Sequence, residues 1–155
     1  MKAITAMTVN VVCIAPRETL RGAYEIMTEW GIRHLPVMEG KKLVGILSDR
    51  DILIRSSLEN GVIHVPESAV SGAMTPQPMT CGPSTSVAHM VDLMLEHKID
   101  SLPILDEDGI LVGLVTSADL LEMLREREQL SGHRAIPFKF QIQQGAARAT
   151  GFAST

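Results

Sequence analysis

The sequence is poor in aromatic residues, in cysteine and in clustered positive charge. Aromatic residues make up 3% of its 155 residues, so the core must consist mainly of aliphatic side chains and some of the nine methionines. A net charge of −4 argues against a nucleic-acid or anionic-membrane partner, because either would require grouped Lys and Arg. No apolar run approaches the length that spans a bilayer. We therefore expect a cytoplasmic globular protein.

The reactive side chains form no recognisable catalytic or metal-binding pattern. Two cysteines in a cytoplasmic chain seldom form a structural disulfide, so we interpret Cys13 and Cys81 as buried free thiols. No serine or cysteine stands beside an evident base, which argues against an enzyme. Several histidines lack the i, i+4 pairing with carboxylates that would hold a metal ion, namely His64, His89, His97 and His133. We therefore assign no metal site.

One unit of sequence occurs twice, and this repetition is the strongest feature of the chain. The recurring segments are Ala6–Thr8 with Ala73–Thr75, Leu35–Val37 with Leu102–Ile104, and Gly45–Asp51 with Gly113–Asp119. The offset is 67 positions for the first two segments and 68 for the third. Because one copy alone would leave an apolar face uncovered, we expect the two copies to pack together.

Each copy predicts a β-α-β-β-α order of elements, and hence a mixed α/β (α+β) fold. Short extended stretches open the copies and end before a proline, and Thr19 and Ser86 are candidate helix caps. Tight turns then join two strands, and a final helix begins at Asp49 or Ser117. The predicted strands are Val9–Ile14, His34–Met38 and Leu43–Leu47 in the first copy, and Met79–Cys81, Ser101–Leu105 and Ile110–Val115 in the second.

Composition divides the chain into three parts. Residues 1–68 hold the first repeat with its connector. The connector sequence runs from Ser56 to Ser71, and we expect a short helical turn at its end, before Met74. Residues 69–130 hold the second repeat, and 131–155 form an extension. Within the extension, Phe138–Ile142 alternates apolar and polar residues as a strand does, and the final stretch Gly145–Thr155 is small and polar, as in a frayed tail.

The most informative motif is Gly-x-x-Ser/Thr-x-x-Asp, which follows the last strand of each copy. Ser48 with Asp51, and Thr116 with Asp119, are typical of a capping box that only stabilises the helix start. The same groups can also bind a nucleoside phosphate, because a hydroxyl and free N–H groups suit a phosphate and a carboxylate accepts hydrogen bonds from ribose hydroxyls. The residues alone leave both interpretations open.

Two copies of this motif in register, together with Leu-Pro-Val/Ile and the repeated Met-Thr, resemble a CBS-domain pair. The resemblance covers roughly residues 6 to 124. It implies a regulatory module without catalytic activity. Such a module binds AMP, ADP, ATP or S-adenosylmethionine in two pseudo-symmetric clefts, with Mg²⁺ as a companion of the nucleotide. It also implies a homodimer that passes a conformational change to a separate effector protein.

The resemblance also supplies candidate nucleotide-binding residues. Asp51 and Asp119 would hold ribose hydroxyls, and Ser48 and Thr116 would meet phosphate. The rest of the expected set is Arg33, His34, Arg50, Ser117, Ile14, Pro36 and Pro103. The first copy carries the positive charge, since Asp100, Ser101 and Ala118 occupy the positions of Arg33, His34 and Arg50. We therefore expect one stronger phosphate-binding site.

Two alternatives to a nucleotide sensor remain at this stage. One is a sensor of S-adenosylmethionine or of an NAD-type ligand. The other is a ligand-free dimerisation or docking module that uses its helices and the Phe138–Ile142 strand.

Overall fold

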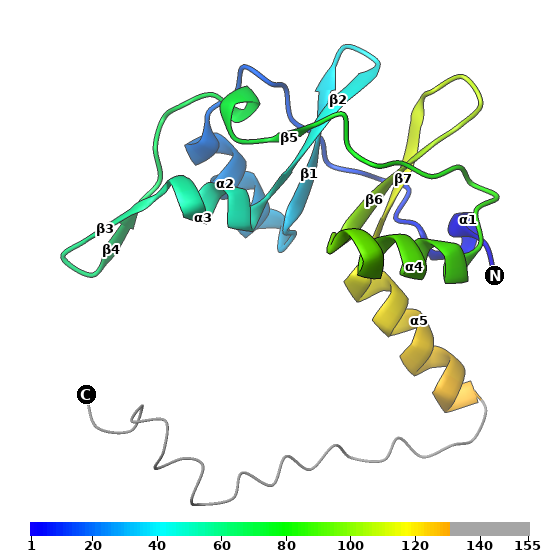
Figure 1. The fold of residues 1–155 in the computed structure, drawn as a ribbon. Coiled ribbons are helices and arrows are strands. Elements are labelled where there is room, and N and C mark those ends of the chain that lie inside the picture. Colours follow the sequence, from blue (N-terminus) through cyan, green and yellow to red (C-terminus); the bar gives the residue numbers. More distant parts are fainter. Residues whose placement is uncertain (131–155) are drawn as a thin grey trace, which may run out of the picture. The chain divides into compact units, whose positions relative to one another are not determined.

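The computed structural model describes residues 1–130, and the elements up to Met123 form one compact unit (Figure 1). The helices are α1 (Ala3–Ala6), α2 (Leu20–Trp30), α3 (Asp49–Arg55), α4 (Val87–His97) and α5 (Ser117–Leu130), with a 3-10 turn η1 at Val70–Gly72. The strands are β1 (His34–Glu39), β2 (Lys42–Ser48), β3 (Ser57–Glu59), β4 (Val62–His64), β5 (Thr75–Pro76), β6 (Ser101–Leu105) and β7 (Leu111–Thr116). Both repeats therefore follow the predicted mixture of helices and strands.

The helix that precedes each hairpin starts where the sequence predicts. Thr19 Oγ1 accepts the N–H of Gly22 at 3.0 Å, and Ser86 Oγ accepts the N–H of His89 at 3.2 Å. Each hydroxyl satisfies a backbone donor that the first turn of a helix leaves without a partner. α2 ends at Gly31, whose φ of 63° lies in the left-handed region that glycine enters without steric cost.

The two main hairpins share one register. β1 pairs with β2 so that His34 lies opposite Ser48, and β6 pairs with β7 so that Ser101 lies opposite Thr116. Both hairpins are interrupted by a register shift at the equivalent point of the repeat. Because the motif hydroxyls sit at the open ends of these hairpins, the residues that begin β1 and β6 lie beside them.

The predicted strands Val9–Ile14 and Met79–Cys81 were wrong as strands. Only the last residue of each stretch pairs with its hairpin, Ile14 with Val37 and Cys81 with Ile104, as isolated parallel bridges. The proline two residues later cannot donate an N–H to prolong the ladder. One residue before the first stretch, Thr8 pairs with Leu114 of β7, which belongs to the other repeat.

The segment that precedes each repeat completes the sheet of the other repeat. β5 pairs antiparallel with β2, and the side chain of Met74, one residue before β5, lies so close over Gly45 that a Cβ there would meet it. Met7 covers Gly113 in the same way, with its sulfur 2.5 Å from the place of a Cβ. The two repeats are thus interleaved rather than merely adjacent (Figure 1).

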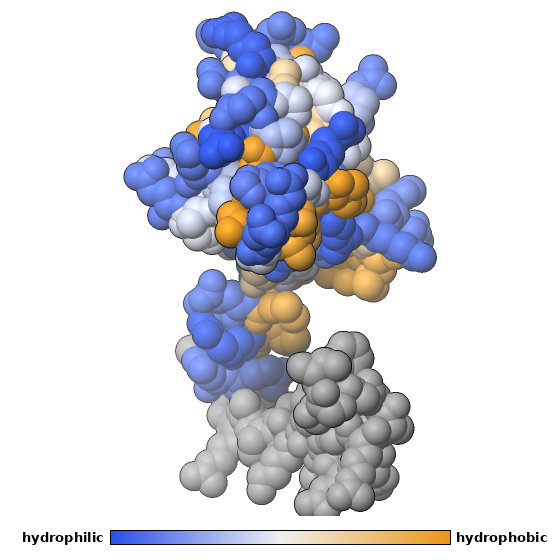
Figure 2. Space-filling view, turned by 90° about the vertical axis from the view of Figure 1, so that its left-hand side faces the viewer, coloured by the Kyte–Doolittle hydropathy of each residue, from blue (hydrophilic) through white to orange (hydrophobic). Residues whose placement is uncertain are grey.

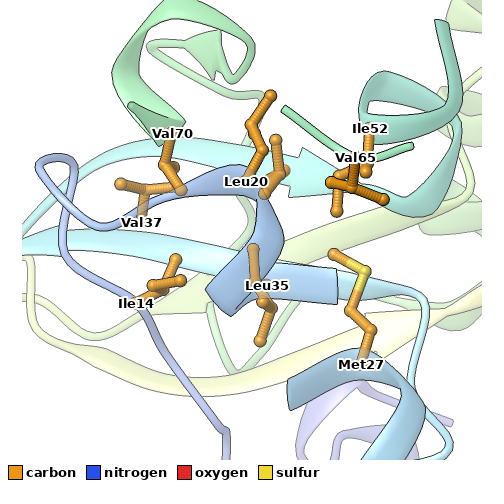
Figure 3. Packing of buried hydrophobic residues seen from close by; sticks show 10 residues of the cluster. Ile14, Leu20, Met27, Leu35, Val37, Ile52, Val65 and Val70 are labelled. Carbon is orange, nitrogen blue, oxygen red and sulfur yellow. The ribbon is translucent and has the colours of Figure 1, made fainter. Parts of the chain in front are cut away.

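Two apolar clusters form the core. In the first, Leu20 and Met27 of α2 pack over Leu35 and Val37 of β1 (Figure 3). Burying one such leucine contributes about 1.5–3 kcal/mol relative to exposure. The first cluster comprises Ile14, Leu20, Ala23, Met27, Leu35, Val37, Leu47, Ile52, Val65 and Val70. The second comprises Ala3, Cys81, Met90, Met94, Leu102, Ile104 and Val115, so that Ala3 at the start of the chain packs with the second repeat.

The connector between the repeats contains a hairpin that the sequence analysis did not predict. β3 and β4 meet at a tight turn in which Asn60 and Gly61 have φ values of 51° and 78°. The short helical turn expected before Met74 is present as η1. On the face that carries this hairpin, apolar groups reach the surface among charged ones (Figure 2). The exposed apolar residues of the hairpin are Leu58, Val62 and Ile63, and the neighbouring helix α3 exposes Leu53 and Ile54.

Both cysteines carry free thiols, but only Cys81 is buried. The expectation of burial was wrong for Cys13, because side chains alternate along an extended chain and Ile14 faces the core. Ile14 and Cys81 occupy equivalent places, as their matching bridges show.

Within residues 1–130, no helix is long and apolar enough to cross a membrane. The predicted strand at 138–142 lies outside the described residues.

Candidate functional site

The Ser48–Asp51 motif forms a complete capping box at the start of α3. The backbone N–H and the hydroxyl of Ser48 both donate to Oδ2 of Asp51 at 2.8 Å. In return, the Asp51 N–H donates to Ser48 Oγ at 3.2 Å. The interpretation of the motif as a capping box is therefore confirmed, because these bonds fix both side chains at the start of α3. It does not exclude a second role in binding a ligand.

The second copy of the motif repeats this geometry. Thr116 donates its N–H and its hydroxyl to Oδ2 of Asp119, both at 2.7 Å, and accepts the Asp119 N–H at 3.3 Å. In both repeats the cap uses one carboxylate oxygen twice, and the other oxygen takes no part in these bonds. Asp51 and Asp119 each line an open cleft, and a carboxylate oxygen that takes no part in the cap can accept hydrogen bonds from a ligand's hydroxyl groups.

Cleft 1 contains the Ser48–Asp51 motif and encloses about 210 Å³. Its lining comes from both repeats: Arg33, His34, Ile46 and residues 48–51 from the first, Thr75, Pro78 and Met79 from the segment between, and residues 97–101 from the second. Positive charge comes from Arg33, Arg50 and Lys98, and carboxylates come from Asp49, Asp51 and Asp100. The cleft thus combines three basic and three acidic side chains with apolar ones such as Ile46 and Ile99.

Cleft 2 contains the Thr116–Asp119 motif and encloses about 300 Å³. Its lining is the counterpart of cleft 1 with the repeats exchanged: Thr8, Asn10, Val11, Val12 and residues 31–34 from the first repeat, and Asp100, Leu114 and residues 116–119 from the second. Within the described part of the chain, Arg33 and His34 are its only basic side chains, whereas Asp100 and Asp119 are acidic. Cleft 2 therefore has less positive charge than cleft 1.

A shared wall separates the two clefts. Arg33, His34 and Asp100 line both of them. Arg33 Nε donates to Asp49 Oδ2 at 3.2 Å, and 71% of the arginine side chain is exposed. Exposed ion pairs of this kind contribute little stability, so a ligand can draw the guanidinium away from Asp49.

His34 differs from Arg33 in its charge. Burial lowers the pKa of the His34 imidazole, although Asp49 and Asp100 act in the opposite direction. A lowered pKa favours the neutral ring at neutral pH. Arg33 is therefore the permanent positive charge of the shared wall.

Eight of the predicted nucleotide-binding residues line the clefts. Ser48, Asp51 and Arg50 lie in cleft 1, Thr116, Ser117 and Asp119 lie in cleft 2, and Arg33 and His34 lie in both. The other three lie outside both linings, because Ile14, Pro36 and Pro103 are buried within the sheets.

The sequence analysis overlooked Lys98 and His97 in cleft 1 and Thr8 and Asn10 in cleft 2. Each cleft takes these residues from the repeat opposite to its own motif. The repeat offset of 67 positions is the signal that could have found them. It makes Lys98 the counterpart of Gly31, and these two residues line equivalent places in cleft 1 and cleft 2. Among the described residues, no three His, Cys, Asp or Glu side chains form a group that could hold a metal ion.

Comparison with known proteins agrees with the duplicated architecture. The family model of the CBS domain matches residues 1–57 and again 70–126. Hypoxic response protein 1 of Mycobacterium tuberculosis is 33% identical over 132 residues, which cover 84% of this chain and 90% of that protein. An inosine-5'-monophosphate dehydrogenase of Korarchaeum cryptofilum is 37% identical over 111 residues. This match covers 72% of the chain but only 22% of the dehydrogenase.

The fold also matches solved structures. The crystal structure of CBSX2 in complex with AMP superposes with a TM-score of 0.73 at 26% identity. This match covers 82% of this chain and 98% of CBSX2. With two family matches in tandem, and with Hypoxic response protein 1 and CBSX2 aligned over at least 90% of their length, this chain belongs to the CBS domain family as a pair of CBS repeats.

Proposed function

We propose that this CBS pair is a regulatory module that binds adenosine nucleotides in its two clefts and passes a conformational change to a partner protein. The observation that carries the proposal is the pair of equivalent aspartates, Asp51 and Asp119. Each is fixed by a capping box through one carboxylate oxygen, and each is a lining residue of a cleft.

Cleft 1 suits a nucleotide with one or more phosphates. The free oxygen of Asp51 accepts hydrogen bonds from ribose hydroxyls. Arg33, Arg50 and Lys98 offset the charge of AMP, ADP or ATP, with Mg²⁺ accompanying the triphosphate. Ile46 and other apolar residues of the lining offer a surface for the flat adenine ring. The AMP complex of CBSX2, which shares this fold at 26% identity, supports this assignment.

Cleft 2 favours a second candidate ligand, S-adenosylmethionine. Asp100 and Asp119 face a cleft that has one permanent cation, and a sulfonium group gains from that balance of charge. S-adenosylmethionine carries a single carboxylate and no phosphate, so it needs less compensating positive charge than AMP, ADP or ATP. The two clefts therefore differ in ligand charge while sharing recognition of the adenosine part.

The module acts as a homodimer inside the cell and regulates an effector in trans. The free, unpaired thiols of Cys13 and Cys81 suit a reducing compartment such as the cytoplasm. Ligand binding biases the packing of the two interleaved repeats, because both clefts contain residues from both repeats.

Isothermal titration calorimetry with AMP, ADP, ATP and S-adenosylmethionine tests the proposal. We expect at least one nucleotide to bind, and binding to disappear in the double variant Asp51→Asn/Asp119→Asn while its thermal unfolding stays cooperative. The control variant Glu59→Gln lies on β3, away from both linings, and should bind like the native protein. No heat from any of the four compounds at millimolar concentration would refute the proposal.

A further inference from the structure

The wall that the two clefts share carries one permanent cation, Arg33. Among the residues that line cleft 2, only Arg33 and His34 are basic, and both also line cleft 1. Cleft 1 has Arg50 and Lys98 in addition, whereas residues 1–130 supply cleft 2 with no cation that it does not share. An anion in cleft 2 therefore depends on Arg33 far more than an anion in cleft 1 does.

The position of Arg33 already favours cleft 1. Its guanidinium is bound to Asp49, which lines cleft 1 and is absent from the lining of cleft 2. The other groups on the shared wall do not compensate. Asp100 adds negative charge to both clefts, and the burial of His34 favours its neutral ring.

We propose that the two clefts are antagonistic, so that a phosphate-bearing ligand in cleft 1 weakens the binding of a phosphate-bearing ligand in cleft 2. This inference rests on the proposed function, since it names how the same two sites regulate each other. A phosphate in cleft 1 recruits Arg33 and removes the one permanent cation of cleft 2. Two bound phosphates also repel each other across the shared wall.

The antagonism has two further properties. By thermodynamic linkage it is reciprocal, so a phosphate in cleft 2 weakens cleft 1 by the same factor. It also depends on charge, because adenosine carries no phosphate and makes no use of Arg33. The module would thus respond to the charge of its ligands as well as to their concentration.

Calorimetry on variants that isolate each cleft tests the inference. Asp51→Asn leaves cleft 2 as the binding site, and Asp119→Asn leaves cleft 1. We expect AMP to bind the isolated cleft 2 about fivefold or more tightly than it binds the same cleft in the native protein already loaded in cleft 1. With adenosine, the two affinities should agree within about twofold.

Two charge variants serve as controls. In Arg33→Gln, cleft 2 should bind AMP no better than adenosine, and the difference between isolated and loaded clefts should shrink to the part that phosphate–phosphate repulsion contributes. In Arg50→Gln, AMP should bind cleft 1 more weakly while the antagonism persists.

The possible failures are distinguishable. Two independent AMP sites of unchanged affinity in the single variants would overturn the antagonism and leave the proposed function intact. If AMP does not bind cleft 2 even in Asp51→Asn, the antagonism is likewise overturned and the proposed function is left intact. Absence of binding to both clefts of the native protein would overturn the proposed function itself, and the antagonism with it.

Discussion

Asp51 combines a structural and a ligand-binding role, and two substitutions separate them. Asp51→Ala removes the acceptor of two hydrogen bonds from Ser48, both 2.8 Å long. It leaves the Ser48 N–H at the start of α3 without its partner. Loss of a helix cap costs about 0.5–2 kcal/mol, and hydrogen bonds to charged groups lie at the upper end, so we expect the free energy of unfolding to fall by about 2 kcal/mol.

Asp51→Asn should behave differently. The side-chain amide oxygen can still accept from Ser48, so the cap survives, and the lost charge near the helix start costs about 0.5 kcal/mol. The other atom becomes an NH₂ group, which cannot accept hydrogen bonds from ribose hydroxyls. We therefore expect Asp51→Asn to lose AMP binding in cleft 1 while it keeps nearly native stability.

Urea denaturation and calorimetric titration of both variants measure the two effects separately. Asp119→Asn and Asp119→Ala provide a matched pair, because Asp119 makes the same bonds in the second repeat. Equal destabilisation by Asn and Ala would show that the capping bonds are not what Asp51 contributes to stability. Native AMP binding by Asp51→Asn would show that the second oxygen does not hold the ribose.

Three further predictions follow from local structure. Gly113→Ala should destabilise the protein by about 1–3 kcal/mol in urea denaturation, because a Cβ there would displace Met7; a neutral effect would contradict the close contact. Burial lowers the pKa of His34, so the unfolded chain binds its proton at higher pH than the folded protein does. Stability should therefore fall as pH drops through about 6.5, and His34→Gln should reduce this loss; an unchanged pH profile in that variant would argue against it. A disulfide reagent should modify Cys13 in the folded protein and reach Cys81 only on unfolding; equal rates would contradict their different burial.

Much of the fold could be predicted because each repeat carries its own local signals. The predicted strand His34–Met38 differs from β1 by one residue, and Thr19 caps α2 as expected. Alternation and capping depend on neighbours in sequence, so a single sequence reveals them. α2 buries Leu20, Ala23 and Met27, and it leaves Trp30 63% exposed at its end.

The parts that could not be predicted depend on contacts between the repeats. Periodicity gave no sign that Thr8 would pair with the sheet of the second repeat, or that Met74 would cover Gly45. The same exchange places Lys98 in cleft 1, next to a motif from the other repeat. The equal offset between copies implies such a pseudo-twofold arrangement, but only the packed structure identifies which side chains meet.

The most direct test of the account is a crystal structure of the protein grown with AMP. The account predicts the ribose hydroxyls within hydrogen-bond distance of the carboxylate oxygen of Asp51 that does not serve the cap, and the phosphate beside Arg33. A structure in which both clefts stay empty at saturating AMP, or in which AMP binds away from Asp51 and Asp119, would contradict it.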